Sequence, residues 1–142
     1  MKCSEGNPMT YYLDSNILIF VLRGMNKGLA EKIDSIYDYE IKIPSVVVAE
    51  LVEGAYASKD AKHTVEQTMK YLDTFEMIPF DKDAAMIYGR IGAKLRAEGR
   101  KIGSNDLMIA STVMSRNGIL ISNNTKEFNR IDGLRLEDWT EL

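Results

Sequence analysis

A chain of 142 residues fits one domain of ordinary size, with enough length to bury a core without disulfides or a structural metal. Its single cysteine, Cys3, excludes an intramolecular disulfide and a thiolate zinc cluster, and its single histidine, His63, argues against multi-histidine metal sites. The formal net charge of −3 gives no sign of a nucleic-acid partner, because proteins that bind phosphate backbones are usually basic overall.

The ends of the chain carry no recognisable targeting signal. No apolar run approaches the roughly 18 to 20 residues that span a bilayer, and residues 1–10 lack the apolar segment of a signal peptide. We therefore expect a cytoplasmic protein. Residues 1–8 are polar and predict a disordered leader, with Met9 as an alternative start, and residues 9–142 predict a single domain.

Short apolar runs alternate with amphipathic segments along the chain. Ser15 or Asn16, then Ser45, and later Ser104 are placed to cap three of the helices. In chain order we expect a strand over 10–13, helices over 17–24 and 28–37, a strand over 41–43, a helix over 45–57, a helical segment from 65 to 75, an extended segment over 77–79, a helix over 84–99, a helix from 104 to 117, a strand over 119–122 and a weaker strand over 134–136.

Strands of three to five residues that alternate with helices favour parallel strands joined by right-handed crossovers. The sequence therefore predicts an α/β fold, a three-layer α/β/α sandwich around a central parallel sheet of four to five strands. Functional sites of such folds form at the carboxyl ends of the strands.

A carboxylate or carboxamide ends or interrupts four apolar segments: Asp14, Glu50, Asp106 and Asn124. An ionisable group beside core residues costs free energy unless a partner compensates it. Glu50 is the hardest of the four to explain structurally, because the segment 46–52 is apolar on nearly every side. Glu53, one turn later, is the solvent-side residue that could be confused with it.

Two of these carboxylates also have ordinary structural explanations. Asp14 precedes an expected helix and can cap it, and Asp106 lies in a first helical turn, where the helix dipole favours acidic residues. Taken together they indicate more, because two carboxylates about 4 Å apart repel by about 4 kcal/mol at an effective dielectric near 20. Three in one pocket call for a cation or for raised pKa values. If a cation is bound, oxygen ligands without histidine or cysteine favour Mg²⁺ or Mn²⁺. Such an ion suits phosphodiester hydrolysis, because it activates water and neutralises charge on a phosphoryl oxygen.

Four segments, in this order, resemble the motifs of the PIN-domain ribonucleases, and specifically those of the VapC-type toxins. Each motif is short, but the four together, at ordinary family spacing, make the resemblance specific, and it runs from about Met9 to Trp139. The segments are Tyr12-Leu13-Asp14-Ser15-Asn16-Ile17-Leu18-Ile19, Pro44-Ser45-Val46-Val47-Val48-Ala49-Glu50-Leu51, Ile102-Gly103-Ser104-Asn105-Asp106-Leu107-Met108-Ile109-Ala110 and Leu120-Ile121-Ser122-Asn123-Asn124-Thr125-Lys126-Glu127-Phe128.

The resemblance implies roles for particular side chains. Asp14 and Asp106 would bind the metal directly, and Glu50 directly or through water; with Asn124 they would form the catalytic set. Asn124 stands where many members of the family carry an acidic residue, which puts a second stable metal site in doubt. The residues that we expect to contact substrate or to support this set are Ser15, Asn16, Ser104, Ser122 and Thr125.

The resemblance also implies partners: a homodimer, a small inhibitory antitoxin, and structured RNA of the tRNA or ribosomal RNA class. The sequence offers partial support in a group of basic residues beside the third and fourth motifs. These side chains can hold phosphates or can simply form a solvated helix face, and the sequence leaves both interpretations open. The residues are Arg90, Lys94, Arg96, Arg100, Lys101, Lys126 and Arg130.

Our leading hypothesis from the sequence is a Mg²⁺- or Mn²⁺-dependent endoribonuclease, a hydrolase that acts as the toxin of a toxin–antitoxin pair. The alternatives are a housekeeping RNA-processing nuclease of the same PIN-like fold and a non-catalytic Mg²⁺-binding α/β signalling module. A small upstream reading frame that encodes a DNA-binding antitoxin would favour the toxin over the processing nuclease. Reproducible cuts in one class of RNA on expression would favour a nuclease, and random or absent cuts would favour the binding module.

Overall fold

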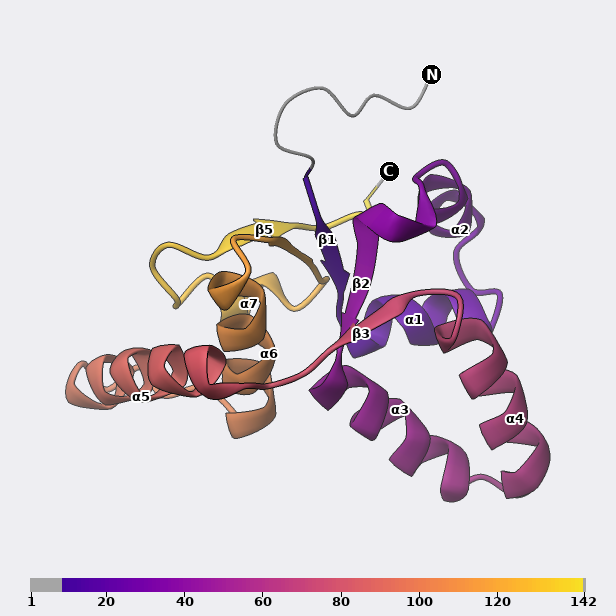
Figure 1. Ribbon diagram of the computed structural model, residues 1–142, viewed down its shortest axis with the longest axis horizontal. Coiled ribbons are helices and arrows are strands. Elements are labelled where there is room, and N and C mark those ends of the chain that lie inside the picture. Colours follow the sequence, from indigo (N-terminus) through magenta and orange to yellow (C-terminus); the bar gives the residue numbers. More distant parts are fainter. Residues whose placement is uncertain (1–8, 142) are drawn as a thin grey trace.

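Five short strands form one parallel sheet at the centre of the protein (Figure 1). The structure is a computed structural model and describes residues 9–141, so the expected leader over residues 1–8 lies outside the described residues. The strands are β1 (Tyr11–Leu13), β2 (Ile41–Pro44), β3 (Glu76–Ile78), β4 (Ile119–Ile121) and β5 (Arg135–Glu137). Their order across the sheet is β3-β2-β1-β4-β5, which puts β1 in the middle.

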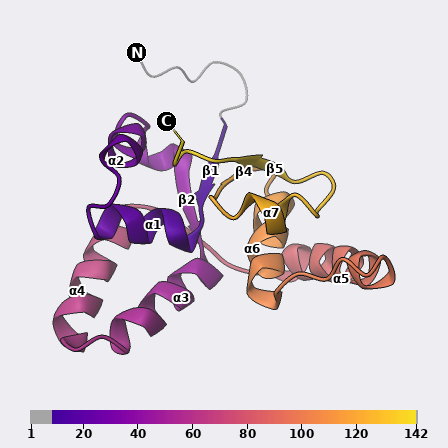
Figure 2. The same ribbon diagram turned by 180° about the vertical axis from the view of Figure 1, so that it is seen from behind.

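Seven α-helices and one 3-10 turn connect the strands within the described residues. They are α1 (Ser15–Leu22), α2 (Lys27–Asp34), the turn Asp38–Glu40, α3 (Ser45–Tyr56), α4 (Ala61–Leu72), α5 (Lys82–Ala97), α6 (Ser104–Ser115) and α7 (Thr125–Phe128). Figures 1 and 2 show α1 to α4 on one side of the sheet and α5 to α7 on the other. Right-handed crossovers explain this division, because the chain moves across the sheet in one direction from β1 to β3 and in the opposite direction from β3 to β4 and β5. The predicted α/β/α sandwich is therefore confirmed, with five strands.

Residues with no exposed apolar surface fill the space between the layers. Leu13, Ile43 and Ile121 lie on the three central strands, and each is at most 1% exposed. Three consecutive buried residues make up β4, as expected of a strand covered on both faces. At the far end of the chain Trp139 is buried and packs against Tyr11, with ring centroids 5.1 Å apart, and this contact anchors the last segment to β1.

The helix starts differ from the expected ones in a consistent way. The N-caps of α1, α3 and α6 are Asp14, Pro44 and Gly103, whereas Ser15, Ser45 and Ser104 are already the first helical residues. The expectation that these serines cap the helices is therefore wrong, and their hydroxyl groups are free for tertiary contacts. The Ser45 hydroxyl, for example, accepts the backbone N–H of Phe80 at 3.2 Å.

The helix ends also differ where the sequence signal was weak. Helix α2 ends at Asp34, and the 3-10 turn Asp38–Glu40 follows after three residues outside any helix. Helix α4 ends at Leu72, and Phe75 is buried beyond the helix. Helix α7, a single turn after β4, was not expected. In the part of the chain that the structure describes, no helix is both long and apolar enough to cross a membrane.

Candidate active site

Side chains from four separate segments meet at the carboxyl edge of the sheet. Asp14 follows β1 directly and Ser122 follows β4 directly. These strands are paired, with Leu13 opposite Ile121, and the backbone N–H of Asp14 donates to the carbonyl of Ile121 at 3.0 Å. The other contributions come from α3 and α6, which begin at or near the same edge.

Asp14 lies deepest in this group, with 5% of its surface exposed. Its Oδ2 accepts the hydroxyl of Ser122 at 2.7 Å, and its Oδ1 accepts the backbone N–H of Ser15 at 2.8 Å. Burial raises the pKa of Asp14 above its usual value even though both hydrogen bonds favour the charged form, and the charge of Glu50 adds to the increase. The capping interpretation is confirmed for Asp14, since it is the N-cap of α1. Its second oxygen contacts β4, which capping alone would not require.

Glu50 is held between α1 and α6 by two side chains. The hydroxyl of Ser15 donates to Oε1 at 2.5 Å, and the amide of Asn105 donates to Oε2 at 3.4 Å. The two polar groups of Ser15 therefore connect Asp14 to Glu50. These contacts explain how a carboxylate is accommodated in the apolar segment 46–52, whereas Glu53 is exposed to solvent as expected.

Asp106, in the first turn of α6, accepts the amide of Asn124 at 3.3 Å. Burial, and then the charges of Asp14, Glu50 and Glu127, raise the pKa of Asp106 to about 6. The amide of Asn124 therefore does not compensate all of the negative charge around Asp106. A cation bound here would relieve that repulsion.

The donor set suits a hard cation, but its present arrangement is not a closed ligand cage. Every ionisable group in it is a carboxylate, and such oxygen ligands favour Mg²⁺ or Mn²⁺ over zinc or copper. Within residues 9–141, however, no three histidine, cysteine, aspartate or glutamate side chains are grouped closely enough to hold a metal as they stand. Asn105 and Asn124 each donate to one oxygen, of Glu50 and Asp106 respectively, and the other lone pairs of these carboxylates remain available to a ligand.

The other residues predicted to contact substrate or to support the site differ in where they lie. Ser15 and Ser122 bond the carboxylates directly, and the Ser122 hydroxyl also accepts the backbone N–H of Asn124 at 3.0 Å. Asn16 lies at the exposed rim, where its amide donates to Asn123 at 3.4 Å. The side chains of Ser104 and Thr125 make no hydrogen bond to the carboxylates of the described chain.

Two residues of the cluster were not predicted from the sequence. Asn105 is adjacent to Asp106, and Glu127 lies on the unexpected helix α7, where it forms an ion pair with Arg130 at 3.5 Å. Both lie inside the quoted third and fourth motifs, so a signal was present. What the sequence did not give was the direction of the two side chains.

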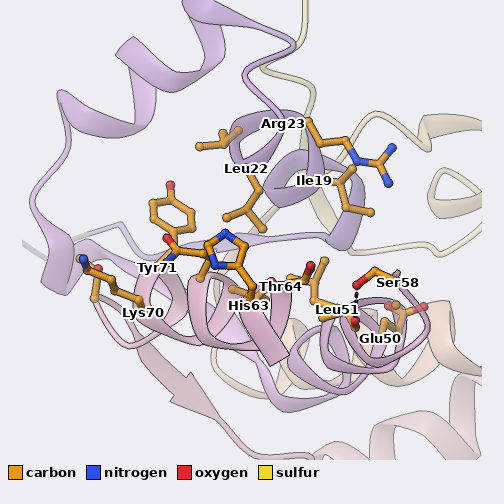
Figure 3. Close-up of a pocket in the computed structure, with 16 residues that line it drawn as sticks. Ile19, Leu22, Arg23, Glu50, Leu51, Ser58, His63, Thr64, Lys70 and Tyr71 are labelled. Atoms are coloured by element: carbon orange, nitrogen blue, oxygen red, sulfur yellow. Dashed lines mark hydrogen bonds between the residues drawn. The ribbon is translucent and has the colours of Figure 1, made fainter. Parts of the chain in front are cut away.

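A groove of about 860 Å³ opens between α1, α3 and α4 (Figure 3). It reaches the carboxylate cluster through Glu50, whereas Asp14 and Asp106 do not line it. Leu22 and Leu51 contribute apolar walls. The basic side chains along it are Arg23, His63 and Lys70.

Comparison with known proteins agrees with the family resemblance found in the sequence motifs. The PIN domain family matches residues 11–134. Ribonuclease VapC1 of Haemophilus influenzae (strain R2866) is 32% identical over 134 residues, which cover 94% of this chain and 100% of the relative. The tRNA(fMet)-specific endonuclease VapC of Shigella flexneri is 33% identical, over 93% of this chain and 99% of the relative.

Among solved structures, the protein is similar to a chain of VapBC2 from Rickettsia felis, crystallised with a DNA fragment from the promoter. The TM-score is 0.84 at 32% sequence identity, over 92% of this chain and 99% of that one.

Proposed function

This chain belongs to the PIN-domain family of VapC ribonucleases, and from that premise we propose that the cluster of Asp14, Glu50 and Asp106 is the catalytic centre. The protein is an endoribonuclease of the toxin–antitoxin type, a hydrolase of RNA phosphodiester bonds. The observation that carries the site assignment is the convergence of three predicted carboxylates from three motifs, where burial and then the charges of Asp14 and Glu50 raise the pKa of Asp106 to about 6.

VapC nucleases of this family are metal-dependent, and we assign the metal here as Mg²⁺ or Mn²⁺. Asp14, Asp106 and Glu50 would hold it, with Glu127 near enough to add to the negative field. When bound, the ion supplies charge neutralisation at a phosphoryl oxygen and lowers the pKa of a coordinated water.

The protein's own polar groups orient this set. Ser122 and the backbone N–H of Ser15 fix both oxygens of Asp14, and the hydroxyl of Ser15 fixes Glu50. Asn124 is neutral at every relevant pH, so it acts as an oxygen or amide ligand and does not accept a proton from water. We therefore propose one tightly bound metal, with a second only when RNA is present.

We propose RNA of the tRNA class as the substrate, because the Shigella flexneri relative is named as specific for tRNA(fMet). Ribosomal RNA is the other class that the test below would reveal. We also propose a cytoplasmic location, because the proposed RNA substrates are found there.

A small antitoxin is the proposed protein partner, since the structural neighbours are toxin–antitoxin complexes. The groove between α1, α3 and α4 is long enough to take a segment of such a partner and leads to Glu50. A segment seated there would cover one side of the catalytic cluster. We retain the homodimer as a proposal on the family resemblance.

Expression in a bacterial host, followed by mapping of RNA 5′ ends, tests this function directly. We expect growth arrest and reproducible cuts in one RNA class, and we expect the Asp106→Asn variant to abolish both. Glu53→Gln is the matched control, since Glu53 is an exposed carboxylate one turn from Glu50. Cuts that persist in excess chelator, or arrest that Asp106→Asn does not relieve, would contradict the proposal.

The names of the relatives favour the toxin over both alternatives. The matched proteins are VapC ribonucleases, and no described feature of the structure favours a signalling module or a housekeeping nuclease.

A further inference from the structure

A small cavity of about 90 Å³ lies between the second half of α5 and the start of α6, separate from the large groove. Buried apolar residues of both helices form its floor, among them Leu95 and Leu107. Exposed polar residues line the rest: Arg96 from α5, Lys101 from the connecting loop and Ser104 from the first turn of α6. No carboxylate is among the residues that line it.

The two cations of this cavity differ from three paired basic residues of the same region. Lys94 is paired with Asp132 at 3.1 Å, Arg130 with Glu127 at 3.5 Å and Arg116 with Asp81 at 3.3 Å. Arg96 and Lys101 form no ion pair with any carboxylate of the described residues. In a chain with a net charge of −3, two unpaired cations on one cavity without an acidic neighbour in its wall make a local positive site.

The size of the cavity limits what it can take. Its volume of about 90 Å³ is small beside the 860 Å³ of the large groove, which matches a compact group such as a single phosphate. Arg96 and Lys101 supply the charge-assisted donors that a phosphate requires, and the hydroxyl of Ser104 adds a neutral donor.

The cavity and the carboxylate cluster share the first turn of α6. Ser104 lines the cavity, and Asp106, two residues later, projects from the other side of the same turn, since residues i and i+2 of a helix do not face each other. An RNA strand that passes over the start of α6 can therefore meet both sites with neighbouring phosphates. Arg96 and Lys101 line this cavity, whereas Arg90 is exposed on α5 and does not line it.

We infer that the cavity formed by Arg96, Lys101 and Ser104 binds a backbone phosphate of the RNA substrate next to the one that is cleaved. The inference rests on the proposed ribonuclease function and adds a subsite to it. The subsite would set the register of the strand without reading its bases, because phosphate contacts position a nucleic acid and carry no sequence information directly. It also gives Ser104 a role, although that residue does not touch the carboxylates.

Binding of a short single-stranded RNA of mixed sequence, followed by fluorescence anisotropy across a series of salt concentrations, tests the subsite. The parent protein is the full chain with Asp14→Asn, so that the RNA stays intact. In this background we expect Arg96→Gln and Lys101→Gln each to weaken binding by roughly five- to tenfold. Each should also reduce the slope of log K against log salt by about 0.7, the value for one lost phosphate contact on a single strand.

The matched controls are Arg100→Gln and Arg90→Gln, which remove exposed cations from the adjacent loop and the same helix without touching the cavity. They should leave the slope unchanged. Equal effects of all four substitutions would overturn the inference in favour of diffuse attraction. So would normal binding by the Arg96→Gln and Lys101→Gln variants.

A second measurement locates the phosphate. A single neutral methylphosphonate linkage is placed at each position of the RNA in turn. At one of these positions it should weaken binding to the parent protein, and this loss of affinity should disappear in the Lys101→Gln variant. A penalty of equal size in parent and variant at every position would also overturn the subsite. If the unmodified chain cuts no RNA and the parent binds none at low salt, the ribonuclease function itself fails, whereas RNA binding without an effect of the cavity variants refutes the subsite alone.

Discussion

The hydroxyl of Ser122 donates a 2.7 Å hydrogen bond to Oδ2 of Asp14, although the two residues are 108 positions apart in the sequence. The pairing of β1 with β4 makes them neighbours, since Leu13 lies opposite Ile121 and each of the two residues follows its strand. Ser122 is fully buried and also accepts the backbone N–H of Asn124. One hydroxyl therefore orients both Asp14, which we propose to be catalytic, and the segment whose amide bonds Asp106.

Replacement of this hydroxyl, Ser122→Ala, should impair both stability and catalysis. The substitution leaves the N–H of Asn124 without its acceptor and removes a donor to a buried carboxylate, so we expect the free energy of unfolding to fall by about 1–2 kcal/mol. The orientation of Asp14 and Asn124 would loosen, and we expect the rate of RNA cleavage to fall at saturating RNA. Urea denaturation and single-turnover kinetics measure the two effects.

Ser111→Ala is the matched control for this substitution. Ser111 is equally buried, but its hydroxyl donates to the carbonyl of Leu107 within its own helix, at 2.6 Å. We expect a smaller loss of stability and an unchanged cleavage rate. If the two alanine variants cleave RNA equally well, the bond from Ser122 to Asp14 does not orient the site.

Asp106→Asn should abolish cleavage and, in metal-free protein, raise stability. The pKa of Asp106 is raised to about 6 from a usual value near 3.8, so folding favours the protonated carboxyl. The stabilisation contributed by the protonated carboxyl of Asp106 is fully present below about pH 4 and is lost as the pH rises through about 6. At pH 7 the charged form is therefore unfavourable by about 1–2 kcal/mol, less than the roughly 3 kcal/mol of the full shift, because Asp106 is partly open to solvent.

The measurement is urea denaturation in chelator at several pH values between 4 and 7. The stability difference between Asp106→Asn and the unmodified protein should grow as the pH rises. Asp132→Asn is a control of opposite sign, because the hydrogen bond and charge of Lys94 hold the pKa of Asp132 below its usual value. Its removal should lower stability at neutral pH, and a difference for Asp106 that does not change with pH would contradict the assigned shift.

Bound Mg²⁺ should stabilise the native protein through the three carboxylates. A ligand that binds only the folded state stabilises it by about 2.7 kcal/mol at a hundredfold excess over its Kd. We expect the thermal midpoint of the unmodified protein to rise with added Mg²⁺, and Glu50→Gln to weaken this response together with RNA cleavage. The comparison uses thermal unfolding in chelator and in increasing Mg²⁺.

Glu53→Gln provides the comparison on the same helix, because Glu53 has the same charge and is exposed to solvent. Its response to Mg²⁺ should match that of the unmodified protein. A full response in the Glu50→Gln variant would remove Glu50 from the metal site and leave Asp14 and Asp106 as the candidates.

Much of this site could be predicted from the sequence because its carboxylates are anomalous where they stand. Asp14 ends a buried strand and Glu50 interrupts an apolar helix, so each is costly without a partner. The alternation of short strands and helices then predicted a parallel sheet, and the carboxyl edge of such a sheet is where these residues were expected to meet. The structure brings Asp14 and Glu50 together through Ser15.

The rest depended on contacts that no local pattern encodes. Asn105 and Glu127 are polar residues in polar surroundings, so burial gave no reason to select them. Their roles arise only once α6 and α7 are placed, when Asn105 reaches Glu50 and the charge of Glu127 acts on Asp106. The serine caps failed for a related reason: Ser15 lies one residue inside its helix because Asp14, with an extended backbone, takes the cap position.

Gly118→Ala tests how closely the position of β1 controls the site. A Cβ at Gly118 would overlap the ring of the buried Tyr12, with Cδ1 at 2.6 Å, and would lie 3.3 Å from the carbonyl oxygen of Thr10. We expect the free energy of unfolding to fall by about 1–3 kcal/mol, the range for overpacking a well-filled core. Tyr12 lies on β1 and Asp14 follows this strand directly, so a shift of the ring would also displace Asp14 from Ser122. Cleavage by the folded variant should therefore fall further than the loss of folded protein explains, as measured by denaturation and kinetics on the same sample.

Gly89→Ala is the control. Gly89 lies on α5, a Cβ there would have no atom within 4 Å, and alanine favours the helix by up to about 1 kcal/mol. Its stability should rise with cleavage unchanged, and normal cleavage by folded Gly118→Ala would show that the edge of β1 tolerates a displaced Tyr12.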